Sequence, residues 1–278
     1  MNERGTDTLA TGHNENAAAT PAALLEAEML VRRFGGLIAV NEVSLALHLD
    51  QIHAVIGTNG AGKSTLINLL SGETPASAGR VVLNGIDVTT WPQPRRARAG
   101  LGRSYQRTTI FPLFSVFENC RLTAQAAVQR PWKVWQSAER CRQSAELAFM
   151  ALEAVGLKDA RNKTAGSLSH GEQRLLEIAM CLATRPTVLL LDEPLAGMGA
   201  EETERMLALL QSLKPAHAIL LVEHDMDAVF RIADRITVMV DGSVIASDEP
   251  ENIRNNPAVQ LAYLGTTQVA AARGADTD

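Results

Sequence analysis

A glycine-rich loop between an apolar strand and a helix is the feature that most constrains the fold of this chain. The loop fits the pattern G-x-x-x-x-G-K-[ST] at Gly57, Gly62, Lys63 and Ser64. The preceding segment HAVIG reads as a short buried strand that ends at Gly57, and KSTLINLLSG reads as a helix that begins at Lys63. Glycines let successive backbone N–H groups turn toward one phosphate chain, which then lies at the positive end of the helix. The pattern therefore predicts an α/β fold with a P-loop NTPase core.

Two acids far downstream are expected at the same site. TVLLLDEP is an apolar run that ends in Asp192 and Glu193, as a central parallel strand does when both of its faces are covered. The carboxyl ends of such strands meet in the crevice where open α/β sheets bind ligands. We expect Ser64 and Asp192 to hold Mg²⁺, and Glu193 to be the general base that polarises an attacking water. An ordinary strand-to-loop exit, where acids are common, is the alternative for these acids taken alone. The residues expected around the phosphates are Gly57, Thr58, Asn59, Gly60, Ala61, Gly62, Lys63, Ser64 and Thr65.

The segment LSHGEQRLLEIAMCLATRP, which begins at Leu168, predicts a second anion site. Ser169 is placed to cap an apolar-faced helix, and Gly171 leaves room for backbone close to an anion. The glycine-rich loop already supplies donors to its own phosphates, whereas a helix N-terminus is itself an anion site. We therefore expect Ser169, Gly171 and Glu172 to receive the γ-phosphate of a nucleotide bound to another protomer. A plain N-capped helix is the alternative interpretation.

These three motifs, in this order, resemble the nucleotide-binding subunit of an ATP-binding cassette (ABC) transporter, and the resemblance runs from about Ala27 to Gly265. It implies ATP and Mg²⁺ as ligands. Gln106, in GRSYQRTT, resembles the Q-loop glutamine that contacts Mg²⁺ and senses the membrane subunit. His224, in AILLVEHDMDAV, resembles the switch histidine that contacts the γ-phosphate.

The resemblance also implies a place for the adenine base. Phe34, in VRRFGGLIAV, occupies the usual position of an aromatic residue that stacks on adenine, with Val40 as an apolar neighbour of the base. Without the resemblance, Phe34 would be assigned to core packing and His224 to the polar end of a buried strand.

Two positions depart from the commonest family pattern. The third signature residue is His170, where glycine is usual, and Gly199 stands where an aspartate is frequent. The first departure leaves Ser169 and Gly171 in place, so we expect the trans phosphate site to be retained. The second removes a carboxylate that helps couple the two active sites in relatives.

A finer resemblance points to the branched-chain amino acid importer group, the LivG-like ATPases. It is carried by RRFGGLIAVNEVSL, LSHGEQRLLEIAM, LAGMG and PENIRNNPAVQLAYLG. The implied function is an ATP-hydrolysing subunit that energises an importer for branched-chain amino acids or related small amino acids and amides. A soluble ABC-type ATPase of translation or DNA repair is the alternative. The implied partners are a second ABC ATPase subunit and transmembrane permease subunits, and the implied place is the cytoplasmic face of the inner membrane, as a peripheral protein.

Composition agrees with this interpretation. The net charge of −5 argues against a general nucleic-acid binder, which needs a basic surface. The three cysteines are odd in number and lack metal-ligand spacing, so they read as reduced thiols. No apolar run approaches the roughly 20 residues that span a bilayer. A local basic stretch is expected to be a solvated face; it contains Arg95, Arg96, Arg98, Arg103 and Arg107.

The expected organisation is a single ABC ATPase domain over residues 24–265, with a disordered extension at 1–23 and a flexible tail at 266–278. Residues 27–50 and 80–90 alternate enough to form a small antiparallel sheet, and residues 107–170 are expected to form a helical subdomain.

Three phenylalanines shortly after Gln106 invite a prediction about the partner surface. Phe117 is assigned to the core of the helical subdomain. Phe111 and Phe114, beside a proline, are assigned to an exposed apolar patch that the permease subunits contact.

Overall fold

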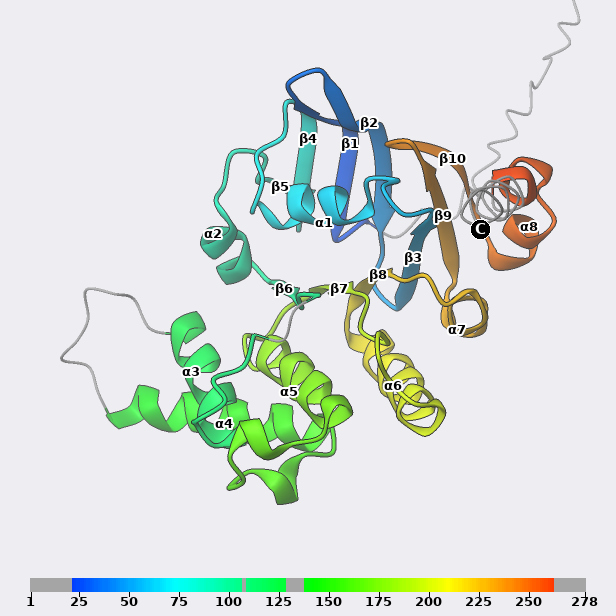
Figure 1. Ribbon diagram of the computed structural model, residues 1–278. Coiled ribbons are helices and arrows are strands. Elements are labelled where there is room, and N and C mark those ends of the chain that lie inside the picture. The colour runs from blue at the N-terminus through cyan, green and yellow to red at the C-terminus, as the bar shows by residue number, and fades with distance from the viewer. Residues whose placement is uncertain (1–21, 107–108, 129–137, 263–278) are drawn as a thin grey trace, which may run out of the picture.

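The computed structural model describes residues 22–106, 109–128 and 138–262. Residues 1–21 of the extension predicted at 1–23 lie outside these residues, and so does the whole tail predicted at 266–278. The described residues form two sheets with helices around them (Figure 1). One sheet has four antiparallel strands in the order β2-β1-β4-β5: β1 (Leu25–Phe34), β2 (Leu37–Leu47), β4 (Ala78–Leu83) and β5 (Ile86–Asp87). This sheet confirms the small antiparallel sheet predicted from the alternating segments.

The second sheet has six strands. The glycine-rich loop begins at the end of its strand β3, and the acid Asp192 ends its strand β7. Its order is β10-β9-β3-β8-β7-β6, with β10 antiparallel to β9 and the other pairs parallel. The parallel order of strands far apart in the sequence confirms the predicted α/β core. Its strands are β3 (Gln51–Gly57), β6 (Leu101–Arg103), β7 (Val188–Asp192), β8 (Ala218–Val222), β9 (Arg235–Val240) and β10 (Ser243–Asp248).

Every residue of β7 and β8 is buried, as expected for central strands covered on both faces. Because side chains alternate across a strand, the two faces feed two different cores. Val188 and Leu190 pack with the helix that follows the glycine-rich loop, α1 (Lys63–Ser71), and with the antiparallel sheet. Leu189 and Leu191 pack on the other face with α5 (His170–Leu182) and α6 (Ala200–Leu213).

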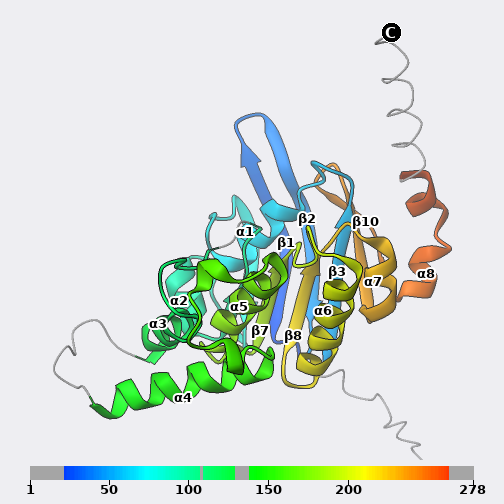
Figure 2. The same ribbon diagram turned by 60° about the horizontal axis from the view of Figure 1, so that its bottom comes forward.

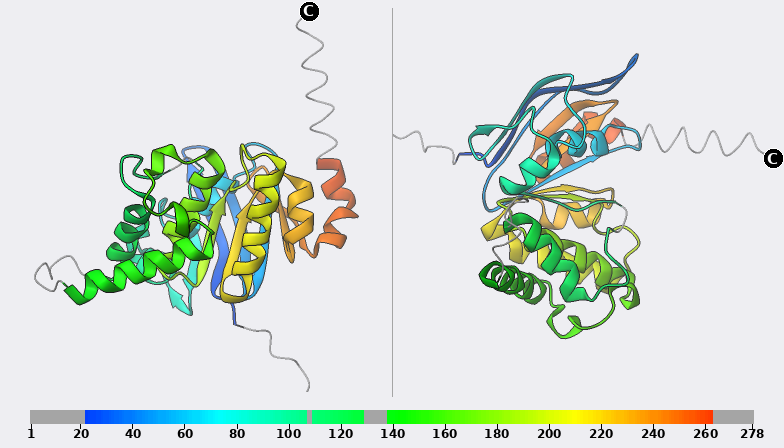
Figure 3. Two further views of the ribbon diagram at one scale, coloured as in Figure 1. Left: turned by 90° about the horizontal axis from the view of Figure 1, so that it is seen from below. Right: turned by 90° about the vertical axis from the view of Figure 1, so that its left-hand side faces the viewer.

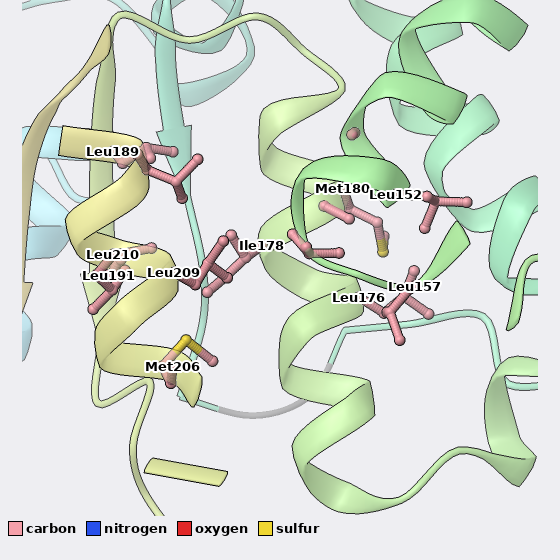
Figure 4. Close-up of a cluster of buried hydrophobic side chains, with 14 of the residues drawn as sticks. Leu152, Leu157, Leu176, Ile178, Met180, Leu189, Leu191, Met206, Leu209 and Leu210 are labelled. Carbon is pink, nitrogen blue, oxygen red and sulfur yellow. The ribbon is translucent and has the colours of Figure 1, made fainter. Parts of the chain in front are cut away.

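Figure 4 shows the second of these cores, in which Met206, Leu209 and Leu210 of α6 lie opposite Ile178 of α5. The helices α3 (Val116–Val128) and α4 (Ala138–Ala154) pack against α5 and occupy the range predicted to be the helical subdomain. In Figures 2 and 3 these helices lie on the side of the molecule opposite to the antiparallel sheet. Phe117 is partly buried against this core, which confirms its assignment.

The remaining helices are short. They are α2 (Gln93–Arg98), α7 (Met226–Ile232) and α8 (Pro250–Arg254), together with the 3-10 helices Lys158–Ala160, Ala165–Ser167 and Lys214–Ala216. None of the helices in the described part of the chain combines the length and the apolar character needed to cross a membrane. Cys120 and Cys181 are free thiols.

The prediction that the basic stretch forms a solvated face is wrong for two of its arginines. Arg95 and Arg98 are exposed, but Arg96 is fully buried and the side chain of Arg103 is buried as well. Arg96 lies under the C-terminal end of α1, where its guanidinium donates to carbonyl oxygens. Arg103 donates to Ser71 Oγ and to the Glu73 carboxylate. A run of arginines cannot show which guanidiniums meet internal acceptors, because those acceptors lie outside the run, in α1 and in the loops beside it. Arg107 lies outside the described residues.

Candidate active site

A cavity of about 680 Å³ lies at the N-terminal end of α1 and gathers most of the predicted nucleotide-binding residues. The glycine-rich loop, Gln106 and Glu193 all reach it, although they come from three separate parts of the sequence. The residues that line it are Phe34, Leu37, Ile38, Ala39, Asn59, Gly60, Ala61, Gly62, Lys63, Ser64, Thr65, Gln106, Glu193, Asp241 and Gly242.

The glycine-rich loop is held by contacts that require glycine and lysine. Gly62 has φ of 95°, and a Cβ there would lie 2.2 Å from the carbonyl oxygen of Ala39, so a side chain is excluded. Lys63 Nζ donates to the carbonyl oxygens of Gly57 at 2.7 Å and Thr58 at 3.1 Å, which folds the lysine back along the loop. Burial lowers the pKa of Lys63, and the nearby carboxylates of Glu193 and Asp192 oppose that shift.

The β9–β10 turn also contributes to this loop, which sequence reasoning missed. Asp241 and Gly242 both have positive φ, as a two-residue Asp-Gly hairpin turn requires. Gly242 N donates to Ala61 O at 3.1 Å, so the turn braces the phosphate loop. The hairpin was visible in the sequence, but its place beside the loop depends on the pairing of β9 with β3.

Asp192 and Ser64 suit a divalent cation. Asp192 ends β7 and is 5% exposed, and within the described residues its Oδ1 is a buried oxygen without a hydrogen-bond partner. Burial raises the pKa of Asp192, while the Arg103 guanidinium opposes the shift. An orphaned buried carboxylate oxygen is costly unless a ligand satisfies it. Oxygen ligands of this kind are what Mg²⁺ prefers, and the exposed Ser64 lies in the adjoining cavity.

Glu193 and Gln106 are joined directly. Gln106 Nε2 donates to Glu193 Oε2 at 3.1 Å, which places the glutamine side chain at the carboxylate predicted to be the base. Glu193 has φ of 49°, a left-handed conformation that is strained for a residue other than glycine. The backbone N–H of Glu193 donates to the Val222 carbonyl at 2.9 Å, so the backbone pairing of β7 with β8 continues to Glu193.

The residues expected around adenine divide between the cavity and the core. Phe34 is 48% exposed at the cavity, and the Arg32 guanidinium lies 4.4 Å from its ring centroid. One face of the ring is thereby occupied. Val40 differs from the expectation, because it is fully buried in the core beside α1 and does not line the cavity. The residues of β2 that line the cavity are instead Leu37, Ile38 and Ala39.

The signature residues do not join this cavity. Ser169, Gly171 and Glu172 line a separate hollow of about 290 Å³ together with residues of α6 and the loop before it. Ser169 caps α5 in a capping box: its Oγ accepts from Glu172 N at 3.2 Å, and Glu172 Oε2 accepts from Ser169 N at 2.8 Å. This confirms the predicted cap.

Two glycines at the signature lie close to side chains of the same chain. A Cβ at Gly171 would lie 2.4 Å from the Glu202 carboxylate, so the close approach here is made by α6. His170 packs against Gly197, where a Cβ would lie 3.3 Å from its imidazole. Gly197 also has φ of 77°, a left-handed conformation that favours glycine whatever lies beside it. Gly199, which stands in place of the common aspartate, is the N-cap residue before α6, and its N–H donates to Glu202 Oε2 at 3.3 Å.

His224 follows β8, and its imidazole is 61% exposed. The residue before it, Glu223, is fully buried, although sequence reasoning did not single it out. Glu223 accepts from Leu195 N at 2.8 Å and from His224 N at 3.2 Å. The only signal in the sequence was a carboxylate directly after the apolar run AILLV.

A buried ion pair on α5, Arg174 with Glu177, bonds to the backbone at Gln106 and at Thr109. Sequence reasoning missed this pair as well. Arg174 donates to the carbonyl oxygens of Tyr105 at 3.0 Å and Gln106 at 2.6 Å. Its partner Glu177, 2.9 Å away, accepts from Thr109 N at 2.6 Å. Both charges lie on the apolar side of the helix, and this placement is the signal that could have revealed them.

Comparisons with known proteins agree on one family. The family model described as ABC transporter matches residues 40–196. The chain is 39% identical over 249 residues to the high-affinity branched-chain amino acid transport ATP-binding protein BraF of Pseudomonas aeruginosa, which covers 87% of this chain and 98% of BraF. The corresponding protein LivG of Escherichia coli gives the same values. Among solved structures, the ADP conformation of MJ1267, an ATP-binding cassette of an ABC transporter, matches with a TM-score of 0.78 and 31% identity, covering 88% of this chain and 99% of that one.

Proposed function

This chain belongs to the ABC transporter family and is an ATPase of that family, and we propose that it energises an importer of branched-chain amino acids or related small amino acids and amides. The observation that carries the proposal is the single cavity in which Lys63, Gln106 and Glu193 meet. The cargo rests on similarity, over nearly their full length, to ATP-binding proteins named for branched-chain amino acid transport. The same similarity favours an importer over a soluble ATPase of translation or DNA repair.

We assign phosphate binding to the glycine-rich loop. The backbone N–H groups of residues 58–65 lie at the N-terminal end of α1, where the helix dipole favours anions. The Lys63 ammonium, now held by two carbonyl oxygens, is within the same cavity and can exchange them for phosphate oxygens. Phe34 offers its free ring face to the adenine base.

Ser64, Asp192 and Gln106 would hold Mg²⁺. The unpartnered Oδ1 of Asp192 supports this assignment, and the exposed hydroxyl of Ser64 provides a second oxygen ligand. When bound, the ion supplies positive charge that neutralises phosphate oxygens.

Glu193 is assigned as the general base and His224 as the group that contacts the γ-phosphate. A carboxylate in the nucleotide cavity can accept a proton from an attacking water, and Gln106 orients it by donating to one of its oxygens. The second carboxylate oxygen is left to face the water. The exposed imidazole of His224 can reach a nucleotide without first leaving a buried site.

A second ATPase subunit, identical or related, would complete the site. Ser169, Gly171 and Glu172 lie in a hollow apart from the nucleotide cavity, so their N–H groups cannot serve the chain's own phosphates in this arrangement. An ATP held between the glycine-rich loop of one subunit and the signature of the other would join the pair.

The permease subunits would dock near Phe111 and Phe114, and the ATPase would be peripheral on the cytoplasmic face of the inner membrane. These rings are 49% and 46% exposed and stack with centroids 5.6 Å apart. Leu113 between them is 89% exposed, so the three side chains form one apolar patch. Side chains of α5 bond to the backbone of Gln106 and of Thr109, which precede this patch in the chain.

Replacement of Glu193 by glutamine tests the chemistry. Glu193→Gln should keep ATP binding but lose turnover by roughly 100- to 10,000-fold, because a positioned general base is lost while the phosphate contacts remain. It should also accumulate an ATP-bound dimer. Phosphate release at saturating ATP and nucleotide binding would be measured side by side. Wild-type phosphate release by Glu193→Gln would refute the assignment.

A further inference from the structure

One buried carboxylate connects the two loops that carry the proposed base and the proposed switch histidine. Glu223 is fully buried at the carboxyl end of β8. Its Oε1 accepts from Leu195 N at 2.8 Å, and its Oε2 accepts from His224 N at 3.2 Å. Leu195 belongs to the loop after β7, whereas His224 belongs to the loop after β8. A single side chain therefore bridges two loops that leave the sheet side by side.

The bridge extends the pairing of the two strands beyond their ends. Residues of β7 and β8 pair in parallel as far as Asp192 and Val222, and Glu193 N then donates to Val222 O at 2.9 Å. Past that point the backbones no longer pair, and the Glu223 carboxylate takes the place of the next backbone acceptor. The Val222 carbonyl thus holds the backbone of Glu193, and Glu223 holds the backbone of Leu195, two residues further on.

The conformation of Glu193 makes such a restraint necessary. Its φ of 49° lies in the left-handed region, which persists in a residue with a side chain only when the surroundings hold it. Glu193 O accepts from Ala196 N at 3.2 Å, so the turn is closed on itself, and Leu195 is the residue inside it that is tied to another strand.

The carboxylate of Glu223 is also costly to bury. Burial raises the pKa of Glu223, and the N–H groups of Leu195 and His224 oppose that shift. The Glu193 carboxylate raises it further, while the His224 imidazole, 3.8 Å away, lowers it. A carboxylate kept here is satisfied mainly by two backbone donors, and both belong to loops of the site.

We propose that Glu223 is a positioning residue for ATP hydrolysis, which holds Leu195 and His224 so that the Glu193 carboxylate and the His224 imidazole keep a fixed relative placement. The proposal rests on the roles assigned to Glu193 and His224 above. Glu223 does not line the nucleotide cavity, and neither do its two partners Leu195 and His224.

The test is a pair of substitutions that alter the bridge in different ways. Glu223→Gln keeps the shape but offers one acceptor oxygen, so its amide N–H₂ faces a backbone N–H and one bond is lost. Glu223→Asp keeps the charge but withdraws the carboxylate by one methylene. If placement matters, both variants should lower kcat by about 10- to 100-fold, the order expected when a reacting group is displaced by about 1 Å. The affinity of the monomer for ATP should stay within about threefold, because the glycine-rich loop is untouched.

Asp225→Asn is the matched control. Asp225 is two residues further on, and its Oδ1 accepts from Ala228 N at 3.1 Å as the N-cap of α7. Asparagine caps about as well as aspartate, so this variant should keep wild-type kcat. All rates are expressed per ATP-binding site, titrated with a labelled nucleotide, so that an unfolded fraction is not counted.

Wild-type kcat per site in Glu223→Gln and Glu223→Asp would overturn the proposal. Failure of both variants to fold would assign Glu223 to stability and would overturn it equally. Glu193→Gln run in parallel separates the two levels of inference. If Glu193→Gln is inactive while both Glu223 variants turn over normally, only the positioning role fails; if Glu193→Gln is active, the assignment of the base fails first.

Discussion

Arg96 should be one of the largest single contributors to stability in this domain, although it lies in a segment that reads as surface. Its side chain is fully buried and donates four hydrogen bonds, all to backbone carbonyls: Trp91 at 3.1 Å, Leu69 and Leu70 at 2.8 Å, and Thr89 at 2.9 Å. Leu69 and Leu70 lie in the last turn of α1, where a cation is favoured, and Leu69 O also accepts from the C-cap Gly72 N at 3.2 Å. Burial lowers the pKa of Arg96 to about 10, so it stays protonated near neutral pH.

The effect of Arg96→Met follows from these bonds. Methionine fills much of the same volume but donates nothing, so each of the four carbonyls loses its bond from Arg96, and Leu69 O keeps only the bond from Gly72 N. At about 1 kcal/mol net for each bond, the four bonds give a loss of about 4 kcal/mol in the free energy of unfolding. For a domain of this size that corresponds to a fall of about 8–16 °C in melting temperature.

Urea denaturation of matched variants checks this value. Arg98, two residues on, is exposed, so Arg98→Met should change the free energy of unfolding by less than about 0.5 kcal/mol. Arg96→Lys keeps the charge but presents its donors from one nitrogen, and should fall between the two. Equal unfolding midpoints for Arg96→Met and Arg98→Met would refute the reasoning, because the carbonyls would then have found other donors.

Three further predictions concern the two halves of the ATP site, the docking surface and pH. Lys63→Ala should abolish nucleotide binding, whereas Ser169→Arg should bind ATP as a monomer but no longer dimerise with a non-hydrolysable analogue; a Ser169→Arg dimer on sizing chromatography would reduce the signature to a helix cap. Phe111→Ser with Phe114→Ser should leave the ATPase folded and active but abolish co-purification with the permease subunits, and a fall of several degrees in melting temperature would instead place the rings in the core. Burial lowers the pKa of His53 to about 4, below its unfolded value, so the unfolded chain binds more protons between these values and stability falls as pH drops through them. Between about pH 7 and pH 5.5 the wild type should lose about 1 kcal/mol more than His53→Gln, and equal pH profiles in urea titrations would contradict this.

The sequence alone determined the elements that depend on short stretches of chain. The glycine-rich loop with its flanking strand and helix, the apolar strand that ends in Asp192, and the Ser169 cap each lie within a few residues. Local rules of backbone conformation, alternation and capping therefore apply to them directly. The order of these motifs also identified the family, and with it Gln106 as a residue of the site.

The tertiary structure decided which of these parts meet and which residues support them. Val40 was expected beside the base, yet the pairing of β1 with β2 turns it into the core and leaves Leu37 and Ala39 at the cavity. Arg96 and Glu223 are charged residues that no motif singles out, and their importance comes from acceptors and donors that distant parts of the chain supply. The burial of these two charges depends on partners such as Leu69 and Leu195, which are close in space and far apart in sequence, so the pattern of either segment alone does not reveal it.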